Sequence, residues 1–265
     1  MGGSRGIAML TRGKTARDRL HRADTWVARE PALRLAAAPL FVDFGFGAEP
    51  SATVETYRRL SAVVPGLRVI GVEIDEERVE SALLSAIPGR LDFRLGGFDL
   101  PINQWERASV VRAINVLRAC NERQYHDAID RLGRGLRDGG VLLEGTSSPT
   151  GRLLAANVYR RRGAGLTRDG LLLAPNLARE WQPREFEDVL PRNVIGATGA
   201  GSWFDELFDR WDKSLDAARD AHLSPRAAFV SAAAELGEEI DHDPALVRRG
   251  FLLVHLPVSV PAFAS

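Results

Sequence analysis

The sequence predicts an α/β protein in which an open, mostly parallel sheet is covered by helices on both faces. From residue 39 to residue 148, short apolar segments of strand length alternate with helical segments of ten to fifteen residues. This alternation is typical of βαβ units. Gly or Pro turn signals bound most of the apolar segments, as they bound strands buried in a parallel sheet. Right-handed crossovers then place helices on both faces.

The first half of the chain supplies most of these elements. The expected strands are Leu40–Gly45, Arg68–Ile74, Leu91–Leu95, Ser109–Asn115 and Val141–Glu144. The expected helices between them are Ser51–Val64, Asp75–Ala86 and Glu122–Leu136. Pro65-Gly66, Pro88-Gly89 and Asp138-Gly139-Gly140 end these helices, because Pro and Gly interrupt helical structure.

The alternation of strand-like and helical segments is less regular after Ser147. The remaining expected strands are Leu171–Ala174 and Phe251–Leu256, and the remaining helices are Pro183–Leu190, Trp203–Ala221 and Pro225–Glu238. We divide the chain into a basic arm with a helix over residues 1–38 and one sheet domain over residues 39–265. Residues 149–250 are expected to elaborate that domain, and a separate cap domain is the alternative.

Charge and cysteine content exclude several classes of protein. With 35 basic and 35 acidic residues, no global field strong enough to hold nucleic acid or an anionic membrane is expected. The single cysteine, Cys120, excludes an internal disulfide and a cysteine-built zinc site. No apolar stretch reaches the ~20 residues that span a bilayer, and Met1–Lys14 lacks the apolar core of a signal peptide. We therefore expect a cytoplasmic protein with no membrane partner.

A glycine turn follows the first expected strand, where the chain reads VDFGFGAEPS. Gly45 and Gly47 flank Phe46 and permit a tight turn with close approach of the backbone to a ligand. Pro50 suits the first position of the next helix. A structural turn without a ligand is the alternative.

The second expected strand ends in a carboxylate, Glu73, within GVEID. Ligands of open α/β sheets bind beyond the carboxyl ends of the strands, and a carboxylate there can accept both hydroxyls of a ribose. Burying it without a partner is costly. An exposed Glu at the strand end is the alternative.

VDFGFG followed by VIGVEID resembles the first two motifs of class I (Rossmann-like) S-adenosylmethionine-dependent methyltransferases. The resemblance implies a doubly wound, mostly parallel seven-stranded sheet and S-adenosyl-L-methionine as cofactor, with S-adenosyl-L-homocysteine as product. By the same resemblance, Asp43 lies near the methionine end, the turn of Gly45, Phe46 and Gly47 lines the cofactor, Glu73 holds the ribose, and Ile74 packs on the adenine.

The resemblance continues to about residue 148. LGGFDLP is similar to the segment after the third strand, but Gly97 stands where the family has an acidic residue, so Phe98 is expected to stack on the adenine and Asp99 to be its polar partner. Val110–Arg118 resembles the fourth strand and its loop, where Asn115 would meet the cofactor, and Leu136–Ser147 resembles the fifth strand. Glu49 replaces the third glycine of the first motif, which motivates a non-catalytic cofactor-binding module as an alternative.

A nicotinamide dinucleotide is disfavoured. Its fingerprint needs a third glycine where this chain has Pro50, and its ribose acid comes about 20 residues after the glycines. Glu73 lies 26 residues after Gly47.

The acceptor is not identified by the sequence. A small molecule is expected, and a general base could come from Glu144, Asn115 or Arg118. Arg152, Arg160–Arg162 and the arm from Arg5 to Arg22 suggest an RNA acceptor as an alternative, although solvated charge is the simpler interpretation. No metal is expected, because the His residues show no ligand spacing with carboxylates; His126 is expected to be structural. The aromatic residues Trp181, Trp203, Phe204, Phe208 and Trp211 are expected in a core or a homodimer surface, with an acceptor pocket as the alternative.

Overall fold

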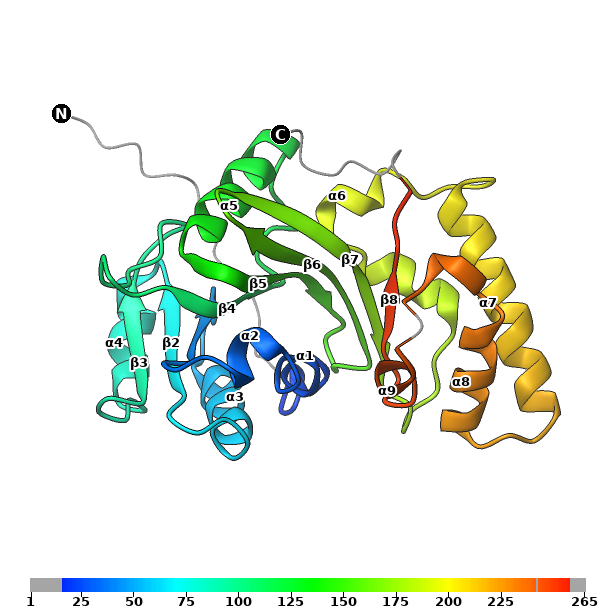
Figure 1. The fold of residues 1–265 in the computed structure, drawn as a ribbon, viewed down its shortest axis with the longest axis horizontal. Coiled ribbons are helices and arrows are strands. Elements are labelled where there is room, and N and C mark those ends of the chain that lie inside the picture. Colours follow the sequence, from blue (N-terminus) through cyan, green and yellow to red (C-terminus); the bar gives the residue numbers. More distant parts are fainter. Residues whose placement is uncertain (1–15, 242, 258–265) are drawn as a thin grey trace.

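The computed structural model describes residues 16–241 and 243–257, and within them an eight-stranded sheet forms the centre of the molecule (Figure 1). The strand order is β3-β2-β1-β4-β5-β6-β7-β8. The strands are β1 (Leu40–Phe44), β2 (Arg68–Glu73), β3 (Leu91–Leu95), β4 (Ala108–Ile114), β5 (Leu136–Ser147), β6 (Leu153–Arg162), β7 (Gly165–Pro175) and β8 (Leu252–Val254). Strands β1 to β5 pair in parallel, and β6, β7 and β8 each pair antiparallel with the strand before.

The doubly wound α/β class is confirmed, but the expected count of seven strands is wrong for the described residues. The missed strand is β6, whose last residues are Arg160–Arg162. In the sequence, the basic residues at its end resemble a charged surface segment. Its buried part, Leu153–Tyr159, pairs along β5. The Asp138-Gly139-Gly140 segment lies inside β5 rather than ending a helix.

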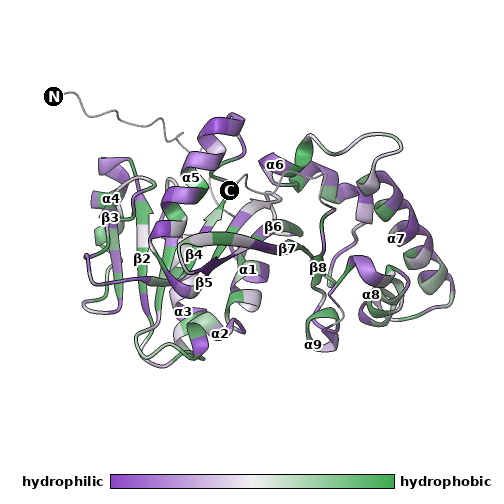
Figure 2. Cartoon of the chain, turned by 45° about the horizontal axis from the view of Figure 1, so that its top comes forward, coloured by the Kyte–Doolittle hydropathy of each residue, from purple (hydrophilic) through white to green (hydrophobic). Residues whose placement is uncertain are grey.

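Helices cover the two faces of the sheet. In Figure 1, α1 (His21–Val27), α2 (Pro31–Arg34) and α3 (Ser51–Ser61) lie on one side, and α5 (Glu122–Arg134) lies on the other. The remaining helices are α4 (Glu76–Leu83), α6 (Arg192–Ile195), α7 (Trp203–Asp220), α8 (Pro225–Ala234) and α9 (Pro244–Val247), with 3-10 helices η1 (Pro183–Val189) and η2 (Gly237–Glu239). Figure 2 shows mostly hydrophilic colouring along α5; its buried residues occupy one narrow stripe, as expected for an amphipathic surface helix.

The core on the α1–α3 face is continuous across the whole sheet. One apolar cluster runs from Trp26 of α1 through Val69 and Val141 to Leu172 and Phe251. The other face carries two clusters, one beneath α5 and one beneath η1, α7 and α8. Residues 149–250 therefore extend the same sheet and share its core.

The aromatic residues of the second half lie largely inside the second of these clusters. Trp181, Phe204, Phe208 and Trp211 are buried, and Trp203 is half-buried against them. The Phe186 and Trp211 rings are stacked at 5.7 Å. The expectation of core packing is confirmed for the buried four.

The edge strand β3 has few free backbone groups. The backbone carbonyl of Arg90 and the backbone N–H of Gly96 bond to β2. Backbone groups alternate in direction along a strand, so those of Leu91, Phe93 and Leu95 point away from the sheet. Leu91 exchanges both of its bonds with Ile87, and the Phe93 N–H donates to the Asp92 carboxylate at 2.9 Å. Three of the outward-facing backbone groups of β3 are therefore already hydrogen-bonded.

No helix within residues 16–241 and 243–257 combines the length and apolar character needed to cross a membrane.

Candidate functional site

The chain leaves β1 through a bend that only glycine fits well. Gly45 and Gly47 have φ of 73° and 87°, in the left-handed region that costs other residues about 1–2 kcal/mol. A Cβ on Gly45 would lie 2.6 Å from the Cγ2 of Val116, in the loop after β4. The bend is therefore fixed by both its torsions and its packing.

Glu73, at the end of β2, faces this bend. Its Oε2 accepts the Gly47 N–H at 2.9 Å, and its Oε1 accepts the Ile74 N–H at 2.8 Å. Nη1 of Arg78 lies 3.8 Å from Oε2. The side chain is 4% exposed, and each carboxylate oxygen keeps a second acceptor direction. The glycine bend and the strand-end carboxylate thus converge, as the sequence predicts.

The bend lies at the switch point of the sheet. The chain runs from β1 outward to β2 and β3 and then returns to β4 on the other side of β1. Ligands of open α/β sheets bind at such a point, beyond the carboxyl ends of the strands. Asn115 follows β4 there with φ of 65°, and its Oδ1 accepts the Ser147 N–H at 3.1 Å. The side chain of Asn115 therefore joins the ends of β4 and β5.

Asp43 is fully engaged within the protein. Its carboxylate accepts two bonds from the Arg112 guanidinium, at 3.0 and 2.7 Å, and one from the Thr53 hydroxyl at 2.6 Å. Arg112 is 0% exposed and also donates to Asp24 of α1 at 2.6 Å. Burial acts to lower the pKa of Arg112, but Asp43 and Asp24 outweigh it and raise that pKa. This network ties α1, β1 and β4 together behind the bend.

The residues expected at the adenine lie in and around the segment after β3. Ile74 and Gly97 are half-buried, and a Cβ on Gly97 would meet open space. Phe98 is buried, with its ring 5.4 Å from that of Phe44. Asp99 is exposed and pairs with Arg131 of α5, which lowers its pKa. Phe98 and Asp99 thus connect this segment to α5.

A buried polar cluster lies on the α5 face, between the two apolar clusters there. At its centre is Glu144 of β5, 1% exposed, whose Oε2 accepts bonds from the Tyr125 hydroxyl at 2.7 Å and the Asn157 Nδ2 at 2.9 Å. The Tyr125 and Tyr159 hydroxyls are 3.1 Å apart, and Asn193 of α6 accepts from Asn157 at 2.9 Å. Burial raises the pKa of Glu144 to about 7, although the bonds from Tyr125 and Asn157 act to lower it.

Asn157 Oδ1 in this cluster is buried and has no hydrogen-bond partner. Such an orphaned acceptor is uncommon in a core. The cluster thus holds one carboxyl group that can gain a proton and one acceptor that lacks a donor.

A cavity of about 350 Å³ opens beside the cluster. It is lined by Glu122, Tyr125 and His126 of α5, by Arg192 and Asn193 of α6, and by Gly196 and Ala197. The sequence identifies Glu144 as a candidate but places His126 in a structural role and misses Tyr125, Asn157 and Asn193. A usable signal exists: Glu144 and Asn157 are polar residues inside otherwise apolar strands, and they are direct cross-strand partners.

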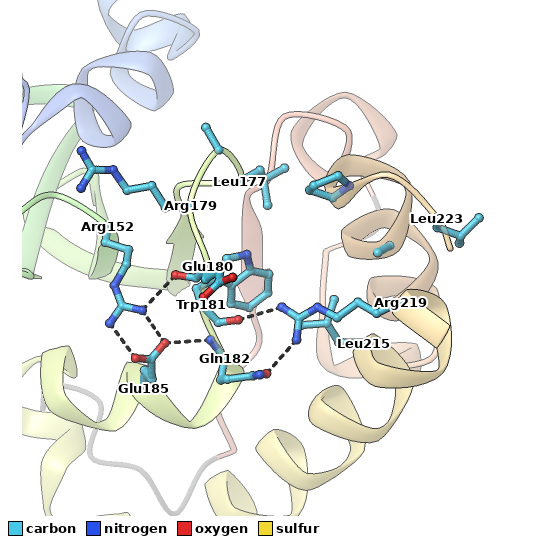
Figure 3. A pocket seen from close by; sticks show the side chains of 13 residues that line it. Arg152, Leu177, Arg179, Glu180, Trp181, Gln182, Glu185, Leu215, Arg219 and Leu223 are labelled. Atoms are coloured by element: carbon cyan, nitrogen blue, oxygen red, sulfur yellow. Dashed lines mark hydrogen bonds and ion pairs between the residues drawn. The ribbon is translucent and has the colours of Figure 1, made fainter. Parts of the chain in front are cut away.

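A larger cavity of about 770 Å³ lies between η1 and the α7–α8 pair (Figure 3). Figure 3 shows Arg152 bonded to Glu185, at 2.6 and 2.7 Å, and Arg219 bonded to Gln182 at 2.9 Å. The partners of both guanidiniums are thus supplied by the cavity wall itself.

The other basic candidates are dispersed. Arg160 pairs with Asp169 at 2.6 Å and with Glu30 at 3.4 Å, and Arg162 reaches Asp169 at 3.4 Å. Arg118 is exposed in the loop after β4. The part of the basic arm from Arg5 to residue 15 lies outside the described residues. Around the described candidates, acidic partners offset much of the positive charge.

No protein-family model matches the chain, and no curated protein matches it. Similar solved structures include a chain from the complex containing the Haloferax volcanii Trm112 methyltransferase activator, at 24% identity over 48% of this chain and 52% of that one, with a TM-score of 0.38. The plantazolicin methyltransferase BpumL is 12% identical over 48% and 46%, with a TM-score of 0.37. Human N-acetylserotonin methyltransferase is 19% identical over 48% and 33%, with a TM-score of 0.36.

The matched region spans about half of the first of these chains and less of the other two. The contacts of the chain itself define an open α/β protein with a glycine bend and a carboxylate at its switch point.

Proposed function

We propose that the protein binds S-adenosyl-L-methionine at the bend after β1 and transfers its methyl group to a small-molecule acceptor. The supporting observation is the bond from the Gly47 N–H to the Glu73 carboxylate. This bond brings together a glycine turn that a ligand can approach closely and a carboxylate of the kind that binds ribose hydroxyls. Both lie at the edge of the sheet where ligands of such sheets bind.

The residues at this point fit a nucleoside. Gly45 and Gly47 present backbone without side chains, and Glu73 retains acceptor capacity for ribose hydroxyls. Ile74 and Gly97 would border the base, with Phe98 and Asp99 following. Asp43 would act by holding the bend, because its carboxylate already accepts three bonds from Arg112 and Thr53. A bound sulfonium cofactor supplies an activated methyl group, so alignment of the acceptor can provide much of the rate.

A small acceptor is favoured over RNA by the pairing of the basic residues. Arg152 and Arg160 are each bound to acidic partners, so each would have to exchange a protein carboxylate for a phosphate. We place the acceptor region within residues 149–250 together with the start of α5.

Calorimetric titration with S-adenosyl-L-homocysteine tests the cofactor. We expect saturable binding to the wild type, a loss of at least tenfold in affinity for Glu73→Gln, and no measurable binding for Gly45→Val, because its side chain would collide with Val116. Arg160→Ala is the control and is expected to bind like the wild type.

NADH serves as the rival ligand in the same titration. Absence of saturable S-adenosyl-L-homocysteine binding to folded wild type rejects the proposal, and binding of NADH instead would assign the bend to a dinucleotide. Cofactor binding without methyl incorporation into any fraction of a cell extract would identify a non-catalytic module.

A further inference from the structure

We propose that the cavity between α5 and α6 binds the methyl acceptor, a small phenol, and that Glu144 takes up the phenolic proton through the hydroxyl of Tyr125. This inference rests on the proposed function for the cofactor, but it concerns a different cavity and different residues. Tyr125 is the group that both lines the cavity and hydrogen-bonds Glu144.

One loop of the chain connects the proposed cofactor site to the cavity. The loop after β4 packs Val116 against Gly45 at its start. At its end the carbonyl of Cys120 accepts a bond from Nε of Arg192, in the cavity wall, at 2.9 Å. Asn121 then caps α5, which carries Tyr125 and His126. One short loop therefore has the glycine bend at one end and the cavity at the other.

The size and lining of the cavity indicate a single aromatic ring. Its volume of about 350 Å³ lies near the lower end of the ~300–1,000 Å³ range of ligand pockets. Gly196 and Ala197 are small, Tyr125 and His126 are aromatic, and Tyr125 and Asn193 connect the cavity to the polar cluster. A monocyclic ligand with one hydroxyl matches this arrangement.

The acidity of Glu144 matches a phenol better than an aliphatic alcohol. A base works best when its pKa lies near the working pH, and burial raises the pKa of Glu144 to about 7. A phenolic hydroxyl has a pKa of about 10. The difference from the pKa of Glu144 is small enough when the proton is only partly transferred in the transition state. Among the described residues, no ion pair involves Glu144. Its carboxylate is therefore not held in the charged state by a salt bridge.

The step balances in atoms and charge. The phenolic oxygen forms a bond to the methyl carbon while the sulfur–methyl bond breaks and its electron pair returns to sulfur. The phenolic proton passes to the Tyr125 oxygen as the Tyr125 proton passes to Glu144. A positive sulfonium and a negative carboxylate become a neutral thioether and a neutral carboxyl. The new carboxyl proton is a donor in the cluster that contains the unpaired Asn157 Oδ1.

Several other titratable or charged groups face this cluster. They are His126 beside Tyr125 on α5, Tyr159 on β6, Cys120 before α5, Arg168 on β7 and Arg192 on α6. Tyr125, Tyr159 and Cys120 have raised pKa values because burial disfavours their charged forms, with Glu144 adding to the effect. His126 lines the cavity beside Tyr125, so its role must be separated from that of Glu144 by substitution.

The test uses 4-fluorophenol as probe, followed by fluorine NMR on the full-length protein loaded with S-adenosyl-L-methionine or S-adenosyl-L-homocysteine. We expect saturable binding of the probe to the wild type and its conversion to 4-fluoroanisole, at a rate that rises with pH to a plateau above about pH 7. Glu144→Gln should lower the rate at pH 8 by at least ~100-fold, the lower end of base catalysis, and remove the pH dependence. Tyr125→Phe should do the same, whereas His126→Gln should keep the pH dependence.

Matched controls are Glu180→Gln, in the other cavity, and Tyr57→Phe, on α3; both should behave like the wild type. Binding of S-adenosyl-L-homocysteine to Glu144→Gln should be unchanged, which also shows that this variant folds. Wild type that binds S-adenosyl-L-homocysteine but not 4-fluorophenol overturns the acceptor assignment alone. Probe binding without conversion, or an unchanged pH profile in Glu144→Gln, overturns the role of Glu144. Failure of wild type to bind the cofactor product rejects the proposed function instead.

Discussion

Glu144 couples protonation to folding, because it is a core carboxyl group whose pKa is raised by burial to about 7. In the unfolded chain its pKa is 4.5. Between these values the folded state binds more protons than the unfolded state, so the contribution of Glu144 to stability falls as pH rises from about 4.5 to 7. The usual surface carboxylate, whose pKa is lowered by a partner, has the opposite sign.

Glu144→Gln should therefore gain stability relative to the wild type as pH rises. A neutral Gln resembles the protonated Glu, so its stability does not depend on this proton. At about 1.4 kcal/mol per pKa unit, we expect the difference in unfolding free energy to shift by roughly 3 kcal/mol between pH 4.5 and pH 8. Urea unfolding at both pH values measures it. A difference independent of pH would show that Glu144 titrates normally.

The Arg112 network is a second feature at the residue scale. Here, unlike at Glu144, a buried charge is paired with charges of opposite sign. Two carboxylates, Asp24 and Asp43, surround one fully buried guanidinium. Removing one member of such a group leaves uncompensated charge in the core, at a cost of about 3–5 kcal/mol. The sequence predicts that Asp43 lies near the cofactor, and its contacts tie it to Arg112 and Thr53.

At the scale of elements, β3 is the strand whose exposed edge matters most. Asp92 caps the outward Phe93 N–H and also pairs with Arg94 at 2.7 Å. Leu83 at the end of α4, Leu84 directly after it and Leu95 of β3 are exposed. A charged cap beside apolar residues is a common defence against edge-to-edge pairing.

Asp92→Val should increase self-association. The substitution frees the Phe93 N–H and adds a β-branched apolar residue at the edge. Sedimentation velocity at increasing protein concentration should show dimers or larger species that the wild type does not form. Glu80→Val, on the exposed side of α4, is the control. Equal association of both variants would mean that added apolar surface, rather than the freed edge, is responsible.

The elements from β1 to β4 could be predicted because local pattern and tertiary role agree there. Apolar segments between Gly and Pro signals place β1, β2 and β3 within a residue or two of their observed bounds. The same logic fails for β6, because its Arg160–Arg162 end is polar while its burial comes from pairing with β5 and β7. Hairpin pairing is a non-local property that a single segment does not reveal.

The candidate site divides in the same way. The glycine bend and Glu73 are adjacent to strand ends, so topology alone brings them together. The cluster around Glu144 is assembled from α5, β5, β6 and α6. Its members Tyr125 and Asn193 come from segments whose packing the sequence does not define. His126, which the sequence places in a structural role, lines the cavity near α6.

For the whole molecule, the continuous core on the α1–α3 face predicts a single cooperative unfolding transition. Val69 and Val141 of the parallel part share that cluster with Leu172 and Phe251 of the antiparallel part. Calorimetry should give a van't Hoff enthalpy equal to the calorimetric enthalpy. Two resolved transitions would instead indicate that residues 149–250 form an independent unit.

The contacts of α1 have a consequence for how the protein is made. Arg22 donates to the carbonyls of Arg249 and Gly250, and its guanidinium lies 4.1 Å from the centre of the Phe251 ring. A ribosome delivers those partners more than two hundred residues after Arg22 itself. Asp24 of the same helix can bond Arg59 and Arg112 much earlier, so the contacts of α1 are completed only when residue 250 has been made. A premature stop codon shortly before residue 249 would remove the carbonyl and ring partners of Arg22 and so weaken the docking of α1 as well.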